Sequence, residues 1–556
     1  MIRLIVASAF LVCSLATAGP NHPLPLFNFS NIISVDNILD TIRSNRTDCQ
    51  QIARLFLARI RLYNARLGAV TVLNYRGSLA DARRLDAYRK RTSGRLFGRL
   101  HCVPTLIKDN ILVAGLPTTL GLRAFASANA KTDAGSVWRL KSEGALILGK
   151  ASLTPFSFGL KAPDEPNEIS SQCRNPYSFS GGRSISVYGS SCGNAVAQGA
   201  RLSVIGLATD TAGSVTWPAS ECGLVAVRPI SKTYDSTGVF PLLKNAGDTV
   251  APIAFTVSDV ALILDIISTS NRTSRTYLSQ ASPVRHNGAQ YRIGLIRDLV
   301  YAQSETSINV TRVDGTSVDY YLDEDIFTAT EQFVERIQHA NVTVVNLTIN
   351  LKDFVEQIDR IHRVWTDVFA CTPQWIDAFF KRYPFLVKKQ NVQTLIHNLD
   401  EMLALDNIPP HYRRFFSLFA AYRVHCLPSV RRLRKVRTAA KRLLQKRIFD
   451  VDDVDVIAFP RPHRIRSHLD SVSDAFFMLD PAGALGFPAM NLPIGFTQDQ
   501  GRHTKSDHRR HAKGTPIGMY FMTRPRKFKA MLDIARLYEQ AIRHEPGESY
   551  LPPEFA

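Results

Sequence analysis

The sequence predicts an α/β fold, and three features of the 556-residue chain support this prediction. Short apolar runs at 103–107 and 145–148 are bounded by glycine or proline, as buried strands are, and a helix is expected between them. Small residues at 193–199 favour a further helix, and the apolar run at 202–208 favours the next strand. This alternation of strands and helices is typical of α/β proteins. The hydrophobic fraction of 45% is enough to build a large core around such a sheet.

Further helices are expected on both sides of this segment. Asp36 and Asn37 give one helix a polar start, and residues 51–60 repeat apolar side chains at helical spacing. The apolar run at 251–267 is interrupted by two aspartates. We therefore expect a helix there with one face on the core, and not a membrane span.

The N-terminus has the features of a secretory signal peptide. Arg3 precedes an apolar run at 4–15, and the sequence ATA at 16–18 offers a cleavage site. We therefore expect residues 1–18 to be removed and residues 19–33 to form a leader. A retained anchor is the alternative, which the short apolar run disfavours because a membrane span needs about 20 apolar residues.

Six N-x-[ST] sequons occur in the chain, and they begin at Asn28, Asn45, Asn271, Asn309, Asn341 and Asn346. Together with a signal peptide they predict a secreted, N-glycosylated protein. Loss of Cys13 with the signal leaves seven cysteines, so at least one cysteine is unpaired or pairs between chains.

The formal net charge of +20 would attract nucleic acid, anionic glycans or a membrane surface. Its densest part, residues 431–447, alternates basic and apolar residues at helical spacing. We interpret this segment as a solvated helix face, with a polyanion site as the alternative. Because it has no resemblance to a nucleic-acid module, no nucleic-acid partner is expected.

Two serines lie in turns made of small residues, and a lysine lies upstream in a strand-like run. The turns are YGSSCGNA at 188–195 and TDTAGSV at 209–215, which place Ser190 and Ser214 24 residues apart (214 − 190). A serine hydroxyl becomes a nucleophile when a base takes its proton and backbone N–H groups face the oxygen of the attacked carbonyl. Small neighbours permit that close approach. Lys108 is the candidate base.

These blocks resemble the amidase signature family, whose pattern runs GGSSGGSA, a small-residue helix, GTDTGGS and then a Cys-Gly pair. The tail PASECG at 218–223 fits this order, and VPTLIKDN at 103–110 is similar to the segment that carries the family's lysine. The resemblance implies one domain at 34–556, with a central mixed, twisted β-sheet covered by helices on both faces. It also implies a hydrolase that cleaves carbon–nitrogen amide bonds of small molecules, with no cofactor and no metal.

Within that domain, residues 270–450 match the family least and contain most of the aromatic helical sequence. We expect most of these aromatic side chains to pack in a core and some to line a channel for the acyl or leaving group. Residues 480–494 and 514–518 resemble the family's returning strands. The oligomeric state stays open, with a homodimer as one option.

The resemblance also assigns roles to the three residues. Ser214 would be the nucleophile that forms an acyl-enzyme, and Ser190, preceded by a cis peptide bond from Gly189, would relay protons. Lys108 would be the base, which requires a neutral amine, and burial without a carboxylate partner lowers a lysine pKa to about 7–8. Asp109 need not neutralise it, because adjacent residues of a strand point to opposite faces.

The backbone N–H groups of the second turn would bind the oxyanion. They belong to Thr211, Ala212, Gly213 and Ser214. Ala212 replaces the glycine that is more usual in the family. Its methyl group restricts positive φ and narrows the approach to the site.

Three residues compete with these assignments. Ser184 offers a second alignment of the first serine turn, and Lys150 is the rival lysine. His101 lies near Lys108 in the sequence and would serve a histidine-based triad, although no Gly-x-Ser-x-Gly nucleophile elbow accompanies these serines.

Other groups could act outside the triad. Cys192 would be a reactive thiol, whereas Cys222 is expected to fill core space. The polar segment 497–513 would hold a metal through three histidines, although a solvated insertion is favoured; they are His503, His508 and His511. The alternative function is a catalytically weak protein of the same fold that binds polyanions or glycans through its basic surface.

Overall fold

The structure, a computed structural model, describes residues 34–542 with internal gaps, the longest of which are 160–164, 178–184, 270–284, 297–307, 312–316, 348–359, 462–479 and 499–513. The expected signal peptide (1–18) and leader (19–33) therefore lie outside the described residues.

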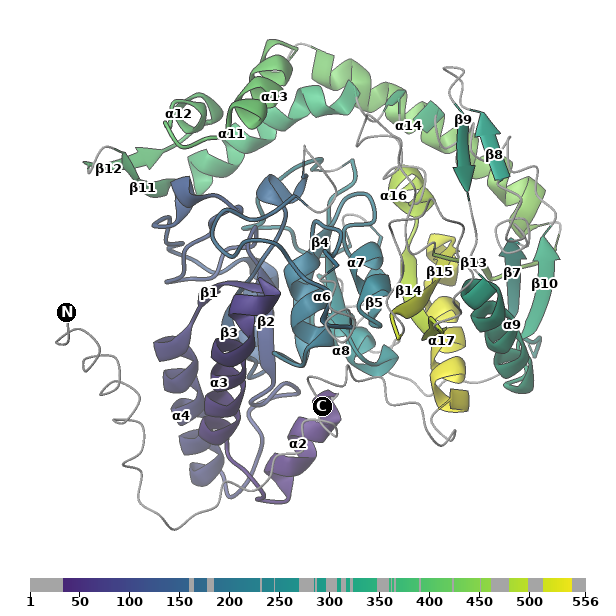
Figure 1. Ribbon diagram of the computed structural model, residues 1–556, viewed down its shortest axis with the longest axis horizontal. Coiled ribbons are helices and arrows are strands. Elements are labelled where there is room, and N and C mark those ends of the chain that lie inside the picture. Colours follow the sequence, from purple (N-terminus) through teal and green to yellow (C-terminus); the bar gives the residue numbers. More distant parts are fainter. Residues whose placement is uncertain are drawn as a thin grey trace, which may run out of the picture.

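One large sheet has the strand order β1-β3-β2-β4-β6-β5-β14-β15-β13-β7-β10 (Figure 1). The neighbours β3, β2 and β4 run parallel, as do β13, β7 and β10, whereas the strands between these two groups pair antiparallel. The strands are β1 (Val70–Leu73), β2 (Pro104–Lys108), β3 (Leu146–Ala151), β4 (Ile205–Asp210), β5 (Val225–Arg228), β6 (Thr249–Ala254), β7 (Arg292–Ile296), β10 (Thr343–Leu347), β13 (Val456–Pro460), β14 (Ala489–Phe496) and β15 (Pro516–Thr523). The prediction of a mixed α/β sheet is confirmed.

Two small hairpins and a set of helices complete the described chain. The hairpins are β8 (Ile308–Thr311) with β9 (Ser317–Tyr320), and β11 (Phe385–Lys389) with β12 (Val392–Ile396). The α-helices are α2 (Val35–Arg43), α3 (Cys49–Leu67), α4 (Tyr75–Arg91), α5 (Gly135–Ser142), α6 (Cys192–Gly199), α7 (Thr216–Glu221), α8 (Val257–Ile267), α9 (Glu324–His339), α11 (Thr372–Arg382), α12 (Leu399–Leu403), α13 (Pro410–Ala421), α14 (Cys426–Leu444), α16 (Pro481–Leu485) and α17 (Phe528–Ile542).

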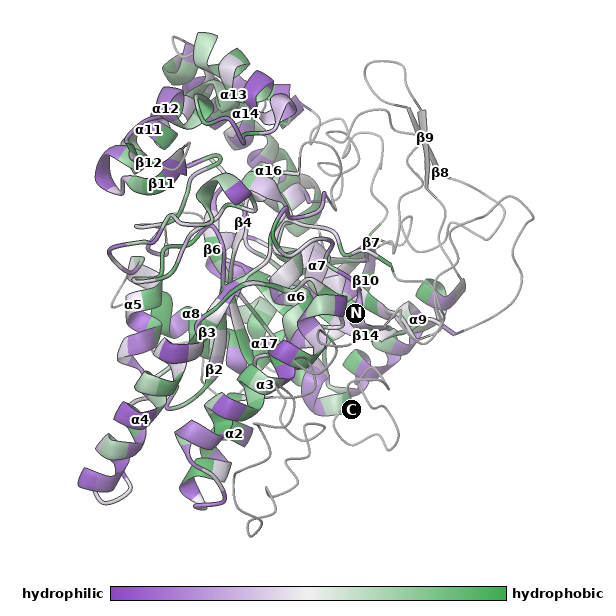
Figure 2. Cartoon of the chain, turned by 60° about the vertical axis from the view of Figure 1, so that its left-hand side comes forward, coloured by the Kyte–Doolittle hydropathy of each residue, from purple (hydrophilic) through white to green (hydrophobic). Residues whose placement is uncertain are grey.

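Helices cover both faces of the sheet. On one face, α6 packs so closely on β4 that its side chains leave no room for a Cβ at Gly206. Helix α7 contacts α6 on the same face. On the opposite face, Phe333 of α9 packs on Phe521 of β15 and on Tyr538 of α17. Hydrophobic residues gather where these helices meet the sheet, whereas α4 is largely hydrophilic at its outer end (Figure 2).

Local capping explains where several helices begin. The side chains of Ser34 and Asp48 accept the N–H groups that α2 and α3 leave unpaired at their first turns. The single helix expected over 251–267 is wrong. Residues up to Ala254 pair within the sheet as β6, and Thr256 then caps α8 by accepting the N–H of Asp259.

A helical arm runs over one end of the sheet (Figure 1). We use this name for residues 367–444, which include the 3-10 helix η6 (Val368–Cys371), α11, the β11–β12 hairpin, α12, α13 and α14. The disulfide Cys371–Cys426 joins η6 to the start of α14. The arm lies within the region that resembles the family least, and it covers the edge at which the candidate site is found.

Two more disulfides, Cys49–Cys102 and Cys173–Cys192, lie in the sheet domain. Cys222 is a free, buried cysteine, so the seven described cysteines form three pairs and leave one thiol. Among the described helices, none combines the length and the apolar character that a bilayer crossing requires.

Candidate active site

The parallel strands β2, β3 and β4 deliver the candidate residues to one edge of the sheet. Because these strands run the same way, their C-terminal residues Lys108, Ala151 and Asp210 emerge together. This edge lies beneath the arm (Figure 1). The carboxyl ends of parallel strands are where α/β sheets bind ligands.

Lys108 and Ser190 are brought into direct contact. The Nζ of Lys108 lies 2.7 Å from the Oγ of Ser190 and 3.1 Å from the carbonyl oxygen of Thr209, and the lysine side chain is fully buried. The Gly189–Ser190 peptide bond is cis, the form that the resemblance implies. Lys108 makes no ion pair within the described part of the chain. Burial lowers its pKa to about 7, while the negative charges of Asp210 and Asp248 oppose that shift.

The rival Lys150 is a different kind of residue. Its Nζ lies 3.0 Å from the carboxylate of Asp109 and 3.0 Å from Oγ1 of Thr118, with both charged side chains fully buried. Burial lowers the pKa of Lys150, and the charge of Asp109 opposes this. Asp109 therefore pairs with Lys150 and leaves Lys108 without a counterion.

Ser214 lies in the turn between β4 and α7, only 4% exposed. The carboxylate of Asp210 accepts the N–H of Gly213 at 3.2 Å and that of Val215 at 2.8 Å, and it is paired with the buried guanidinium of Arg228. Gly213 has a φ of 91°, a conformation that favours glycine. Asp210 and Arg228 were not expected as holders of this turn, although Asp210 stands inside the block TDTAGSV.

The backbone donors of the turn are not equivalent. The N–H of Gly213 is engaged by Asp210, which differs from the expectation that it faces an oxyanion. Within the described residues, the N–H groups of Thr211, Ala212 and Ser214 have no acceptor. Three of the four expected donors therefore remain for a ligand oxygen.

The two serine turns meet through their main chains. The N–H of Ser191 donates to the carbonyl oxygen of Ser214 at 3.1 Å, and the Ser191 hydroxyl donates to the Thr209 carbonyl that Lys108 also contacts. Among the described residues, the hydroxyl groups of Ser190 and Ser214 share no direct hydrogen bond. The structure thus joins lysine to the first serine directly and brings the second serine alongside through the backbone.

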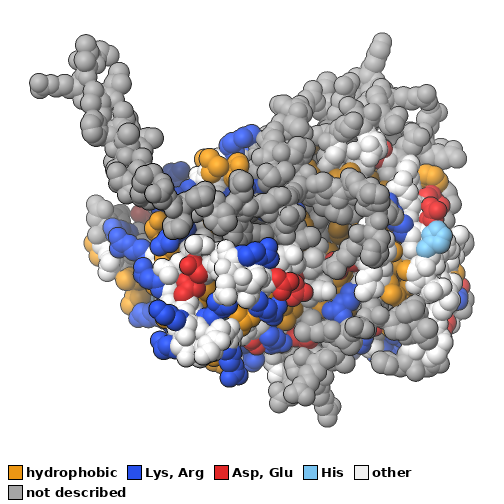
Figure 3. All heavy atoms as spheres, turned by 90° about the horizontal axis from the view of Figure 1, so that it is seen from below, with side chains coloured by type: hydrophobic (Ala, Val, Ile, Leu, Met, Phe, Trp, Pro, Cys, Tyr) orange, Lys and Arg blue, Asp and Glu red, His pale blue; other side chains and the backbone are white. Residues whose placement is uncertain are grey.

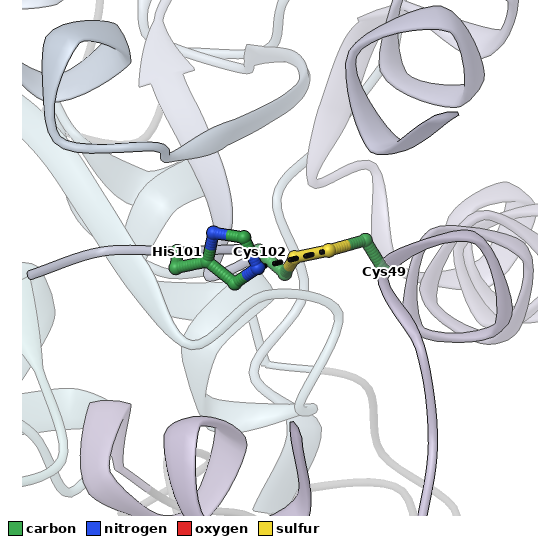
Figure 4. Close-up of side chains that lie close together, drawn as sticks. All are labelled: Cys49, His101 and Cys102. Carbon is green, nitrogen blue, oxygen red and sulfur yellow. Dashed lines mark hydrogen bonds between the residues drawn. A yellow bond between two sulfur atoms is a disulfide. The ribbon is translucent and has the colours of Figure 1, made fainter. Parts of the chain in front are cut away.

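His101 lies away from the candidate serines. It precedes β2, whereas Lys108 ends that strand, so the imidazole lies at the opposite end of the strand from the serines. Its Nδ1 accepts the N–H of Phe97, and its Nε2 lies 3.6 Å from Sγ of Cys49 (Figure 4). Burial lowers the His101 pKa to about 4, which keeps the ring neutral. A histidine-based triad is therefore wrong.

Cys49, His101 and Cys102 are also the residues of the described chain whose donor atoms lie close enough to hold a metal. Their chemistry opposes this. The two sulfur atoms are joined in a disulfide and cannot act as thiolate ligands. Because Nδ1 of the neutral imidazole accepts a hydrogen bond, its proton lies on Nε2, which then has no lone pair for a metal.

The structure describes the two candidate cysteines but not the rival serine or the loop histidines. Cys192 is bonded to Cys173, so the expected reactive thiol is wrong. Cys222 is buried in the core as expected, and burial raises the pKa of its thiol well above the usual value. Ser184 and the loop histidines His503, His508 and His511 lie outside the described residues.

The asparagines of three sequons lie on the described surface. Asn45, Asn341 and Asn346 are exposed, and Asn45 accepts a hydrogen bond from Arg89 at 2.8 Å. The side chain of Asn309, in β8, lies outside the described set, as do Asn28 and Asn271.

Part of the arm's aromatic sequence shares an apolar cluster with the turn that carries Ser214. Ala212 belongs to an apolar cluster that also contains Phe369 of η6. Partly buried rings pack against this cluster, namely Phe158, Trp375, Phe415 and Phe419. Ring centroids of Phe158 and Phe369 are 5.3 Å apart. The turn that carries Ser214 thus contributes Ala212 to the same apolar cluster as the arm.

Known proteins resemble the chain along most of its length. A family profile described as Amidase matches residues 51–532. A glutamyl-tRNA(Gln) amidotransferase subunit of Trichodesmium erythraeum is 25% identical over 530 residues, which cover 91% of this chain and 98% of that relative. A protein described as a probable amidase of Arabidopsis thaliana is 33% identical over 267 residues, covering 48% of this chain and 51% of the relative.

Solved structures share the fold. Peptide amidase from Stenotrophomonas maltophilia superposes with a TM-score of 0.67 at 23% identity, covering 94% of this chain and 98% of that one. A 6-aminohexanoate cyclic dimer hydrolase gives a TM-score of 0.69 at 17% identity, covering 95% and 100% of the two chains. The sheet and its covering helices are therefore an arrangement already seen in amide hydrolases.

Proposed function

The chain belongs to the amidase family and hydrolyses carbon–nitrogen amide bonds, and from that premise we propose that Ser214, Ser190 and Lys108 carry out the reaction. One observation carries the proposal: a buried lysine without a counterion, its pKa lowered to about 7, lies 2.7 Å from a serine hydroxyl. An unpaired buried amine is neutral at neutral pH in a large fraction of molecules, so it can accept a proton.

The reaction follows from this arrangement. Lys108 takes a proton from Ser190 as Ser190 takes one from Ser214, and the Ser214 Oγ attacks the amide carbonyl carbon. Negative charge on the carbonyl oxygen is stabilised by the unpaired N–H groups of the turn. The relay then returns the proton to the departing amine, the carbon–nitrogen bond breaks, and water hydrolyses the acyl-enzyme by the same route.

The substrate is proposed to be a small amide with an apolar group. The cluster that joins Ala212 to Phe369 and the partly buried rings beside it support this choice. A panel of aryl, alkyl and fatty amides, matched with short polar amides, tests it. Faster turnover of the apolar members is expected, and a preference for the polar amides would contradict the proposal.

A fluorophosphonate probe tests the nucleophile. Wild-type protein should label, Ser214→Ala should not, and Lys108→Ala should label far more slowly. The catalytically weak polyanion-binding protein remains the second candidate, supported by the charge of +20. Folded wild-type protein that never labels and cleaves no amide would favour this second candidate.

We also propose that the protein is secreted and glycosylated. Three disulfides favour an oxidising compartment, and the exposed positions of Asn45, Asn341 and Asn346 suit glycan attachment. Expression in a eukaryotic secretory host tests this. Protein in the medium whose mass falls on glycosidase treatment is expected, whereas retention in the cytosol without a mass shift would contradict the proposal.

A further inference from the structure

We infer that Asp248 is a positioning residue, which fixes the start of the oxyanion loop (residues 211–214) and links that loop to the arm. The inference rests on the proposed function of this loop. Asp248 lies just before β6 and touches neither of the proposed catalytic serines, so it acts through the residues it holds.

The carboxylate of Asp248 gathers three donors. Its Oδ1 accepts the hydroxyl of Thr211 at 2.8 Å and the N–H of Leu243 at 2.9 Å, and its Oδ2 accepts the N–H of Leu242 at 2.9 Å. Hydrogen bonds to a charged acceptor are about twice as strong as neutral ones. The first residue of the oxyanion loop is thereby tied to the neighbouring 242–248 turn.

Asp210 and Asp248 hold the loop at opposite ends. Asp210 accepts the N–H groups of Gly213 and Val215, whereas Asp248 accepts the Thr211 hydroxyl. Arg228 connects the two, because it pairs with Asp210 and donates to the carbonyl oxygen of Gly247 at 2.6 Å. With both ends held, the free N–H groups between them keep a set direction before any substrate arrives, which is the condition for oxyanion stabilisation.

The same turn is joined to the arm. The hydroxyl of Thr372, at the start of α11, donates to the carbonyl oxygen of Leu242 at 2.8 Å. Thr372 directly follows Cys371 of the disulfide with Cys426. Leu242, Ala212 and both cysteines belong to one apolar cluster. Asp248 therefore holds both the oxyanion loop, through Thr211, and the turn that the arm contacts, through Leu242.

Asp248 also influences the proposed base. The charged groups that act on Lys108 are Asp210 and Asp248, and each raises its pKa against the lowering that burial causes. Arg228 pairs with Asp210 and stays charged. Burial raises the pKa of Asp248 itself, while the hydrogen bonds from Leu242, Leu243 and Thr211 lower it. Where this carboxylate is ionised, Asp248→Asn should lower the pKa of Lys108 and move the acid limb of the activity profile to lower pH. This shift reports the charge of Asp248, whereas the Thr211 variants report its positioning role.

The main test compares two replacements of Thr211 and follows the fluorophosphonate labelling rate, kcat and KM. Thr211→Val keeps the shape but loses the hydroxyl, and we expect kcat and labelling to fall roughly 10- to 100-fold with KM changed little. Thr211→Ser restores the donor and should stay within about threefold of wild type. Thr92→Val is the matched control, since its hydroxyl donates to the Tyr88 carbonyl oxygen at the far end of α4.

Asp248→Asn supplies the second readout, the shift of the acid limb. Because this variant could lose stability, the Thr211 pair gives an independent test in protein that keeps Asp248. Thr211→Val that labels at the wild-type rate, or Thr211→Ser that is as slow as Thr211→Val, would overturn the positioning role alone. Folded wild type that neither labels nor cleaves amides would overturn the proposed function and, with it, this role.

Discussion

Two buried lysines lie on neighbouring strands, offset by one residue in the pairing register. They differ in that one has a carboxylate partner and the other, among the described residues, has none. Lys150 of β3 is paired in the sheet with Ile107, whereas Lys108 of β2 is paired with Ala151, so the two side chains leave opposite faces. Lys150 meets the carboxylate of Asp109, and Lys108 meets a serine hydroxyl and a carbonyl oxygen. Burial alone therefore does not make a base. Burial without a counterion gives an amine that can be neutral, and burial with one gives a structural ion pair.

The largest expected effect is on catalysis. Lys108→Ala should reduce kcat/KM for an amide by on the order of a thousandfold or more, because the proposed relay loses its base. Lys150→Met should keep most of the activity of whatever fraction folds. Steady-state kinetics on both variants checks this, and equal losses in the two would remove the distinction between the lysines.

The second effect is on stability, where replacing Lys150 should cost more than replacing Lys108. Lys150→Met leaves Asp109 buried without its partner, which typically costs about 3–5 kcal/mol in the free energy of unfolding. Lys108→Met removes an unpaired buried amine and should cost much less. Denaturant unfolding measures both, and Lys108→Met as unstable as Lys150→Met would show that Lys108 also has a stabilising partner.

The pH dependence sharpens the comparison. Activity should fall about tenfold per pH unit below about pH 7, because protonated Lys108 cannot accept a proton. The folded-state pKa of Lys108 lies below 10.5, so the unfolded chain binds more protons between about pH 7 and 10.5 and the contribution of Lys108 to stability rises across that window.

The Lys108→Met variant lacks this pH-dependent contribution. The stability of the variant relative to wild type should therefore be greatest below about pH 7, where burying the protonated lysine costs the wild type most. Unfolding curves at several pH values check the sign. A wild type that is fully active at pH 5 would contradict a base with this pKa.

The smallest effect concerns the thiol. Cys222 is buried, and burial raises the pKa of its thiol, so it should resist alkylation in the native protein and react only after denaturation. Mass spectrometry without reductant should then find alkylation at Cys222 alone among the residues outside the signal sequence. Rapid labelling of the native protein would show that this part of the core opens readily.

Much of the sheet could be predicted because its signals are local. Apolar runs bounded by glycine or proline located β2 and β3, the apolar run at 202–208 located β4, and the small-residue run located α6. The error at 251–267 arose because periodicity does not separate a buried strand from a buried helix in a continuous apolar run. Only the pairing of β6 with β4 and β5 distinguishes them.

The sequence could point to the candidate site residues, but not to the residues that hold them in place. Lys108, Ser190 and Ser214 stand in recognisable blocks, whereas the contact of Asp248 with Thr211 joins positions 37 apart in the sequence. The pairing of Asp109 with Lys150 was likewise invisible, because it depends on strands lying side by side. Hydrogen bonds between distant residues leave no spacing pattern that a single sequence can reveal.

The charge distribution was partly foreseen. Arg431, Arg432, Arg434 and Lys435 are exposed, as the predicted solvated helix face requires. Arg437 in the same helix is instead directed inward and donates to the carbonyl oxygens of Gly483 and Ala484. Lys and Arg side chains also gather on the face that Figure 3 shows from below. Both α3 and α4 carry exposed arginines, which are Arg54, Arg61, Arg66, Arg76, Arg83 and Arg84.

The Cys173–Cys192 bond ties the start of one helix to a residue 19 positions earlier in the chain. Cys192 begins α6 and stands two positions after Ser190, so the cross-link anchors the helix that follows the proposed relay serine. A chain that forms this bond only during export would also complete its catalytic centre there.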